Sequence, residues 1–175
     1  QLRSKHATPA ELFQQTLHLL DLTRTFGATL FVNDRIDVAL AAGADGVHLG
    51  PRDLPMAAAR AAADRAGRTK FLIGGSTDDP DTARRLVRDG ASYIGCGAVF
   101  GTTSKAGLAD ERIGPDRLAR VVAAVDVPVV GIGGVTPHNA GQVAAAGAAG
   151  AAVIRAVMGA DDVGETVQRI LAAFS

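Results

Sequence analysis

The sequence is short of cysteine, of net charge and of long apolar runs, and each shortage excludes a class of protein. Its single cysteine, Cys96, rules out internal disulfides and a cysteine-rich zinc site, and it suits a reducing compartment. Eighteen basic and eighteen acidic residues give a formal net charge of zero. Without a global field, we expect neither nucleic acid nor an anionic membrane as a partner, and small anions must be held locally.

No stretch approaches the roughly 18 uninterrupted apolar residues of a membrane span. The first residues, Gln1 to Lys5, do not resemble a signal peptide. We therefore expect a soluble, cytoplasmic protein, and we leave a homo-oligomer open. A length of 175 residues with 47% hydrophobic content suffices for one buried core but not for two. The sequence thus predicts a single domain over residues 1–175.

The clearest regularity is a repeated junction, in which a helix-like segment ends at glycine, then alanine, then a short β-prone run. Glycine suits this place because the residue after a helix often adopts a left-handed conformation, which strains residues that carry a Cβ. Each junction therefore indicates a helix end followed by a strand. The junctions are Gly27-Ala28, Gly43-Ala44, Gly90-Ala91 and Gly147-Ala148.

Helix starts are marked by a capping side chain followed by proline. Thr8-Pro9, Asp79-Pro80 and Thr136-Pro137 have this form. Threonine and aspartate oxygens accept hydrogen bonds from the first turn of a helix, and proline is tolerated there. We therefore expect helices to begin at these three places.

Seven β-prone runs alternate with helical segments along the chain. Alternation of this kind implies parallel strands joined by helical crossovers, in an open doubly wound sheet or a closed barrel. Seven units are one short of the eight that close a (β/α)8 TIM barrel. We therefore expect an α/β protein with the TIM-barrel fold, whose first βα unit is missing from the chain. The runs are Gln1 to Ser4, Thr29 to Asn33, Gly46 to Leu49, Phe71 to Gly74, Tyr93 to Gly97, Val127 to Ile132 and Ala151 to Ile154.

Ligands of α/β folds bind beyond the carboxyl ends of the strands, and polar residues gather at these places in the sequence. Gln1, Arg3 and Lys5 alternate and so share one face of a strand. In a barrel that face points inward toward the mouth. The alternative is an exposed edge strand whose charges are solvated.

Carboxylates follow two successive strands. Asn33 and Asp34 end one run, and Asp53 follows the next. Parallel neighbours lie about 4.8 Å apart, so these carboxylates can share a cation, and oxygen ligands completed by water and substrate phosphate suit Mg²⁺. The alternative is that they cap the helices that begin near Arg35 and Pro55.

Hydroxyls, an ammonium and glycines follow later strands. Ser76 comes after one run, and Thr102, Ser104 and Lys105 lie in a glycine-containing segment after the next. Such groups suit phosphate oxygens, although a solvated loop would have the same composition.

Two further turns offer backbone N–H groups. The segment 131–134 places three glycines between a strand and a helix, which suits anion binding but is a weak signal alone. The last run leads into Arg155, and loops after the last strands form the usual phosphate site of barrels. By contrast, His48 and Cys96 lie in apolar runs. We expect His48 to be a hydrogen-bonded residue of the core or the mouth, and Cys96 to be a small buried hydrophobe, rather than catalysts.

Taken in order, these segments resemble the thiamine phosphate synthase family over nearly the whole chain. Each motif is unremarkable alone, but the ordered set is specific. The matching stretches are 1–5, Asn33-Asp34-Arg35-Ile36-Asp37, Gly43 to Gly50 with Asp53-Leu54-Pro55, Gly74-Gly75-Ser76, Phe100 with Thr102, Ser104 and Lys105, and Gly131 to Thr136.

The resemblance implies a (β/α)8 barrel enzyme that joins an aminopyrimidine diphosphate to a thiazole phosphate and releases pyrophosphate with Mg²⁺. Residues in contact with the pyrimidine or its diphosphate would be Gln1, Arg3, Lys5, Asn33, Ser76, Thr102, Ser104 and Lys105, with Arg3, Lys5 and Lys105 catalytic. Asp34 and Asp53 would hold the metal. Gly134 and the backbone near Ile154 and Arg155 would hold the thiazole phosphate.

Three positions depart from the family's usual residues: Pro51 replaces glutamine, Gly101 replaces proline, and Arg155 replaces serine or threonine. The rival within the same barrel family is a thiazole tautomerase, which has a histidine where this chain has Ala98. A catalytically silent barrel that binds thiamine precursors or a partner, and another phosphate-binding barrel isomerase, are further alternatives.

Overall fold

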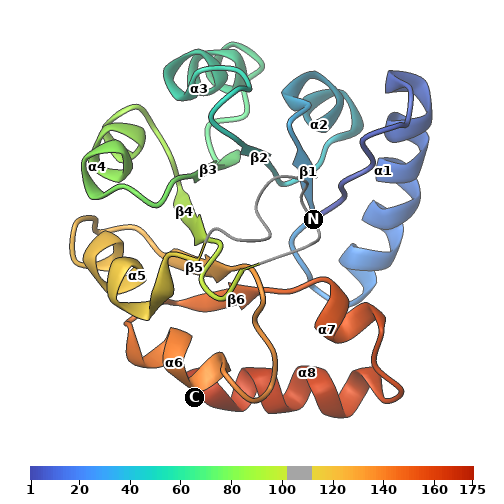
Figure 1. The fold of residues 1–175 in the computed structure, drawn as a ribbon. Helices are drawn as coiled ribbons and strands as arrows, with labels where there is room; N and C mark the ends of the chain where they lie inside the picture. Colours follow the sequence, from blue (N-terminus) through green and yellow to red (C-terminus); the bar gives the residue numbers. More distant parts are fainter. Residues whose placement is uncertain (102–111) are drawn as a thin grey trace. The chain divides into compact units, whose positions relative to one another are not determined.

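The computed structural model describes residues 1–101 and 112–175, and the chain divides into two compact units. Unit 1 comprises Gln1–Gly75 and Arg88–Ser92, and unit 2 comprises Ser76–Val87 and Tyr93–Ser175. Each unit combines parallel strands with helices (Figure 1). The predicted α/β class is therefore confirmed, whereas the single domain and the closed eight-stranded barrel stay predictions.

Unit 1 contains three parallel strands in the order β1-β2-β3, with Asn33 opposite His48 and Leu49 opposite Gly75. Val32, Val47 and Ile73 are fully buried along these strands. Helices α1 and α2 pack together, and α2 packs on β1 and β2 (Figure 1). The elements are α1 (Pro9–Thr25), β1 (Phe31–Asn33), α2 (Ile36–Ala42), β2 (Gly46–Leu49), α3 (Met56–Arg65) and β3 (Leu72–Ser76), the last residue of which belongs to unit 2.

Unit 2 contains β4, β5 and β6, again parallel and in chain order, with α5 and α6 packed on them (Figure 1). Its core includes Ile94, Leu118 and Val143, which are fully buried. No helix within the described ranges is long and apolar enough to span a membrane. The elements are α4 (Pro80–Arg88), the last residue of which belongs to unit 1, β4 (Tyr93–Gly97), α5 (Gly114–Val122), β5 (Val129–Ile132), α6 (Ala140–Ala145), β6 (Gly150–Ala152), α7 (Arg155–Met158), α8 (Val163–Leu171) and the 3₁₀ helix η1 (Ala172–Phe174).

The predicted helix ends are confirmed. Gly27, Gly43, Gly90 and Gly147 have φ angles of 63°, 77°, 106° and 84°, all in the region that favours glycine. Each of these glycines follows a helix and precedes a strand in the chain, as the repeated junction indicated.

Two of the three predicted helix starts are confirmed, and the third is wrong. Thr8 and Glu11 form a reciprocal capping box at α1, and Asp79 accepts a 2.8 Å bond from the Thr82 N–H in α4. Pro137 does not begin a helix, because α6 starts at Ala140. The reason is a side chain: Asn139 accepts a 2.7 Å hydrogen bond from the Thr136 N–H, which fixes a turn where the helix was expected.

The first predicted strand, Gln1 to Ser4, is also wrong in extent. Only Leu2 pairs, through an isolated parallel bridge to Val32. The Leu2 N–H donates to the Phe31 carbonyl at 2.8 Å, and its carbonyl accepts from the Asn33 N–H at 2.9 Å. The backbone pairing therefore reduces to one residue, although it still holds this segment beside β1.

Two arginines of unit 1 bind backbone carbonyls that precede strands. The Arg60 guanidinium donates to the Phe71 carbonyl at 2.8 Å and to the Gly90 carbonyl at 3.3 Å. Arg68 donates to the Ala44 carbonyl at 2.7 Å and lies over the Phe71 ring, 5.6 Å from its centroid. These contacts lie at the amino ends of β2 and β3, away from the strand ends that carry Asn33 and Asp34.

Candidate functional site

The predicted polar residues of unit 1 meet at the carboxyl ends of its strands. Because Leu2 pairs with Val32, its neighbours Gln1 and Arg3 point to the other face of that segment. The Gln1 side-chain amide donates a 2.6 Å hydrogen bond to Oδ1 of Asn33, the last residue of β1. Gln1, Arg3 and Lys5 all have exposed side chains. The first segment and β1 thus present polar groups together, but Lys5 lies in a turn beyond the paired residue, so the shared strand face of Gln1, Arg3 and Lys5 stays a prediction.

Asp34 follows β1 in an uncommon backbone conformation. Its φ is 64°, and it is the only non-glycine residue with positive φ among those that the structure describes. The Asp34 N–H donates to the His48 carbonyl at 2.9 Å, and the Arg35 N–H donates back to the Asn33 carbonyl at 2.8 Å. A bond between residues two apart makes this a γ-turn centred on Asp34, and turns with positive φ of this kind are strained.

The Asp34 carboxyl lies beside that of Asp53. Partial burial raises the pKa of Asp34 above its usual value, and a hydrogen bond and charge repulsion from Asp53 raise it further. Lys5 and Arg3 act in the opposite direction and lower the pKa of Asp34. The structure therefore brings these two acidic and two basic side chains of unit 1 into one electrostatic cluster.

Asp53 is aimed by a tight turn after β2. Its Oδ2 atom accepts a 2.6 Å hydrogen bond from the Gly50 N–H, and its own N–H donates to the Gly50 carbonyl at 3.2 Å. The alternative that these acidic side chains cap helices is wrong. The N-cap residue of α2 is Arg35 and that of α3 is Pro55, and neither helix start has a side-chain cap bond.

The paired carboxylates fit a divalent cation. Two close negative charges repel each other unless a proton or a cation lies between them, and this repulsion contributes to the raised pKa of Asp34. Mg²⁺ is bound in many enzymes by one or two carboxylates, with water and substrate phosphate completing its shell. No cluster of three or more histidine, cysteine or acidic side chains forms within residues 1–101 and 112–175, so the protein's share would be these two carboxylates.

The predicted residues of unit 2 lie on three separate segments. Ser76 is half-buried at the end of β3. Gly134 follows β5 with φ of 67°, and Ile154 and Arg155 stand, exposed, at the start of the four-residue helix α7. Thr102, Ser104 and Lys105 lie outside the described residues, so their predicted contacts are untested.

The glycine turn after β5 is closely packed. A Cβ on Gly134 would lie 2.5 Å from the Gly101 carbonyl oxygen and 3.0 Å from Cβ of Phe100. The predicted helix N-terminus does not adjoin this turn, because α6 begins only at Ala140. The N–H groups of the turn itself, without a helix dipole behind them, are what this segment can offer to an anion.

Sequence reasoning missed Asn139, which shapes the same turn. Its Oδ1 accepts from the Thr136 N–H at 2.7 Å, and its Nδ2 donates to the Gly134 carbonyl at 3.0 Å. The available signal was an asparagine three residues after Thr136, since such side chains bind nearby backbone and compete with helix formation.

Sequence reasoning also missed Arg117 on α5. The Arg117 Nε–H donates to the Asp78 carbonyl at 2.8 Å, and Nε lies 3.4 Å from the Asp78 carboxylate. This pair joins α5 to the segment just after Ser76. Nothing in the spacing of residues 78 and 117 predicted the contact.

His48 and Cys96 are buried, as expected: 6% of the His48 surface and none of that of Cys96 is exposed.

Burial raises the pKa of the Cys96 thiol to about 12. The reactive form of cysteine is the thiolate, so we expect Cys96 to be inert in the native protein at pH 8. Titration with a disulfide reagent should show no free thiol until denaturant is added. Rapid native reaction would contradict the structural role of this residue.

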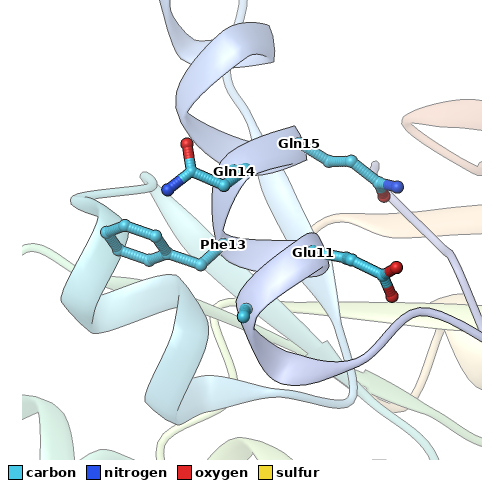
Figure 2. Close-up of a pocket in the computed structure, with 5 residues that line it drawn as sticks. Glu11, Phe13, Gln14 and Gln15 are labelled. Atoms are coloured by element: carbon cyan, nitrogen blue, oxygen red, sulfur yellow. The ribbon is translucent and has the colours of Figure 1, made fainter.

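An open hollow of about 500 Å³ along α1 is unrelated to these residues. Its lining includes Glu11, Phe13, Gln14 and Gln15. Figure 2 shows that Phe13 and Gln14 point to one side of the helix, whereas Glu11 and Gln15 point to the other. These groups therefore do not converge on one point, as the polar groups of a ligand site do.

Comparison with known proteins gives a consistent result. The family model described as thiamine monophosphate synthase matches residues 1–157. A thiamine-phosphate synthase of Natronomonas pharaonis is 46% identical over 171 residues, which cover 97% of this chain and 78% of that protein. One of Chloroflexus aurantiacus is 44% identical over 175 residues, covering 100% and 78%.

A solved structure agrees with these relatives. The thiamine phosphate pyrophosphorylase from Pyrococcus furiosus is 40% identical, with a TM-score of 0.87 over 98% of this chain and 80% of that one. The agreement extends from sequence to backbone and covers both units. The chain therefore belongs to the thiamine monophosphate synthase family.

Proposed function

We propose that this protein is a thiamine-phosphate synthase, a transferase that joins the methylene carbon of an aminopyrimidine methyl diphosphate to the nitrogen of a thiazole phosphate. The single observation that carries this proposal is the cluster of Asp34 and Asp53 with Arg3 and Lys5 at the strand ends of unit 1. The two carboxylates suit a cation, and the two cations suit a diphosphate. The names and sequences of the relatives support the same activity.

The reaction breaks one bond and forms one bond. The bond between the pyrimidine methylene and the diphosphate oxygen breaks, and the diphosphate leaves with the electron pair. The thiazole nitrogen donates its lone pair to the methylene carbon, which forms the new carbon–nitrogen bond. Because that nitrogen carries no proton, the step needs no strong base, and the main demand on the protein is to stabilise negative charge on the leaving group.

Residues of unit 1 meet this demand. Arg3 and Lys5 would bind diphosphate oxygens, and charged hydrogen bonds of this kind are stronger than neutral ones. Asp34 and Asp53 would hold Mg²⁺, which when bound neutralises charge on the diphosphate. Preorganised charge aimed at a leaving group supplies several kcal/mol of barrier reduction.

The side-chain amides of Gln1 and Asn33 would orient the pyrimidine substrate. The Gln1 amide nitrogen donates to Asn33 Oδ1, and this bond fixes the Asn33 side chain so that its own NH₂ group can donate to a diphosphate oxygen. Lys105, Thr102 and Ser104 belong to the same proposed diphosphate site through the family resemblance.

The proposed roles of the unit 2 residues concern both substrates. We assign Ser76 to the pyrimidine, and Gly134 with the backbone at Ile154 and Arg155 to the thiazole phosphate. The absence of a side chain at Gly134 supports this role, because a bare backbone lets a phosphate approach its N–H groups. The closed (β/α)8 barrel, Mg²⁺ dependence and a cytoplasmic location are parts of the same proposal.

The thiazole tautomerase reading is disfavoured by Ala98, a buried residue whose methyl group cannot transfer a proton. The carboxylate pair points the same way, since a tautomerisation has no diphosphate to neutralise. An isomerase of another phosphate-binding barrel type would likewise have no need for it.

The decisive experiment is a pyrophosphate-release assay on the full-length protein with both substrates and Mg²⁺. We expect stoichiometric pyrophosphate and thiamine phosphate, and loss of both when EDTA is added. Pyrophosphate release that persists unchanged in EDTA would contradict the metal site, and isomerisation of a thiazole substrate without pyrophosphate release would favour the tautomerase. Calorimetric binding of both substrates without pyrophosphate release would instead identify a silent binding protein.

A further inference from the structure

The turn that presents Asp34 is followed at once by a clamped arginine. Arg35 binds Asp37 through both ends of its guanidinium group, with Nε to Oδ1 at 2.9 Å and the terminal nitrogen to Oδ2 at 2.5 Å. This is a two-point contact between residues on either side of the first residue of α2. A planar fork on a carboxylate restrains both the distance and the angle between the two groups.

Asp37 connects this clamp to the helix. The pKa of the Asp37 carboxyl is lowered by its bond to Arg35 first, and then, against some burial, by backbone N–H groups of Val38 and Asp37 itself. The carboxylate therefore binds the start of α2, whose N-cap residue Arg35 supplies no capping oxygen. One side chain thus holds both the Arg35 guanidinium and the first turn of the helix.

The Asp34 turn needs such support. A non-glycine residue with φ of 64° is strained and keeps that conformation only when its surroundings impose it. The bonds that impose it are from the Asp34 N–H to His48 and from the Arg35 N–H to Asn33. The second bond is made by Arg35, so any rotation of the Arg35 backbone would release the turn and redirect the Asp34 carboxylate.

We propose that Arg35 is a positioning residue: its forked contact with Asp37 locks the γ-turn that aims the Asp34 carboxylate at the cation. Arg35 touches neither metal nor substrate in this role. The inference rests on the proposed function, because it assigns to Asp34 the metal-binding role given above. It predicts that the clamp affects metal affinity rather than the chemical step.

An ordinary surface ion pair is the competing explanation, and the chain supplies a matched control for it. Arg84 contacts Asp81 on α4 at 2.5 Å, and both side chains are more exposed than those of Arg35 and Asp37. Exposed pairs of this kind contribute little to stability. The two pairs share chemistry, but only Arg35 adjoins a residue with positive φ.

The test is a Mn²⁺ titration of the full-length protein, followed by electron paramagnetic resonance of the free ion. We expect Arg35→Ala to weaken Mn²⁺ binding about tenfold, as loss of residues that support metal ligands does. Arg35→Lys should give an intermediate loss, because lysine cannot form the fork. Arg84→Ala should leave the affinity within about twofold of the parent.

Kinetics provide an independent readout. For Arg35→Ala the Mg²⁺ concentration for half-maximal rate should rise by the same factor, while kcat at saturating Mg²⁺ stays close to that of the parent. If Arg35→Ala fails to fold, as judged by circular dichroism, Arg35→Lys and Asp37→Asn carry the test. Parental Mn²⁺ affinity in the folded variants would overturn the positioning role alone. Absence of Mn²⁺ binding in the parent would instead contradict the proposed metal site.

Discussion

Replacing Asp34 with asparagine should lower Mg²⁺-dependent turnover at least about 100-fold, because loss of residues that merely support a ligand already costs about 10–100-fold. Asparagine has nearly the same shape and tolerates positive φ, so the turn at φ of 64° should survive. The change therefore removes a charge and leaves the backbone in place. Steady-state pyrophosphate release at several Mg²⁺ concentrations measures the effect, and an unchanged rate would remove Asp34 from the metal site.

The same variant should not lose stability. The folded state raises the pKa of Asp34 above its ordinary value of 3.8, so the folded protein binds that proton more tightly than the unfolded chain. Stability without metal therefore falls as pH rises from 3.8 through the raised pKa, and this loss is complete above it. Asparagine does not titrate. In EDTA at pH 7 the variant should therefore have a melting temperature no lower than that of the unmodified protein. The control is Asp21→Asn on the exposed side of α1, which should match the unmodified protein in rate and in melting temperature.

Replacing Gly134 with alanine should damage both folding and turnover. The new methyl group would lie 2.5 Å from the Gly101 carbonyl oxygen, and the residue would keep a φ of 67° that strains alanine. Strain of this type costs about 1–2 kcal/mol, and forced displacement of packed neighbours costs about 1–3 kcal/mol more. Since a shift of 1 Å in a binding turn can cost about 100-fold in rate, we expect a loss of that order.

Gly27→Ala separates the two causes. Gly27 has φ of 63°, close to that of Gly134, but a Cβ there would meet nothing within 4 Å. It should therefore show the conformational cost alone, about 1 kcal/mol, with normal kinetics. Denaturant unfolding and the KM for the thiazole phosphate measure the difference. Equal destabilisation of the two variants would mean that the Gly134 turn relaxes and that its close packing does not matter.

Local backbone rules predicted much of the fold. The four glycine junctions were predictable because a left-handed residue after a helix favours glycine independently of the rest of the chain. The start of α6 was not, because the Asn139 side chain competes for the backbone near Thr136, and a capping pattern does not show which acceptor wins. The extent of pairing at Gln1 to Ser4 was likewise outside local rules, since strand pairing depends on distant partners.

The candidate site was likewise predictable from the sequence only in part. The proximity of Asp34 and Asp53 was predictable, because they follow neighbouring parallel strands. The γ-turn at Asp34 was not, because aspartate is enriched at positive φ but most aspartates still have negative φ. The contact of Arg117 with Asp78 crosses 39 residues and leaves no local trace. The sequence thus indicated that Asp34 and Asp53 meet, and the structure was needed to show how each is aimed.

Two arginines of unit 1 bind backbone at the ends of the strands opposite to the candidate site. Arg60 and Arg68 fasten carbonyls that precede β2 and β3, whereas Asp34 and Asp53 follow the opposite ends of β1 and β2. Substitutions at the amino ends of these strands can therefore alter thermal stability while Asp34 and Asp53 keep their arrangement at the other ends.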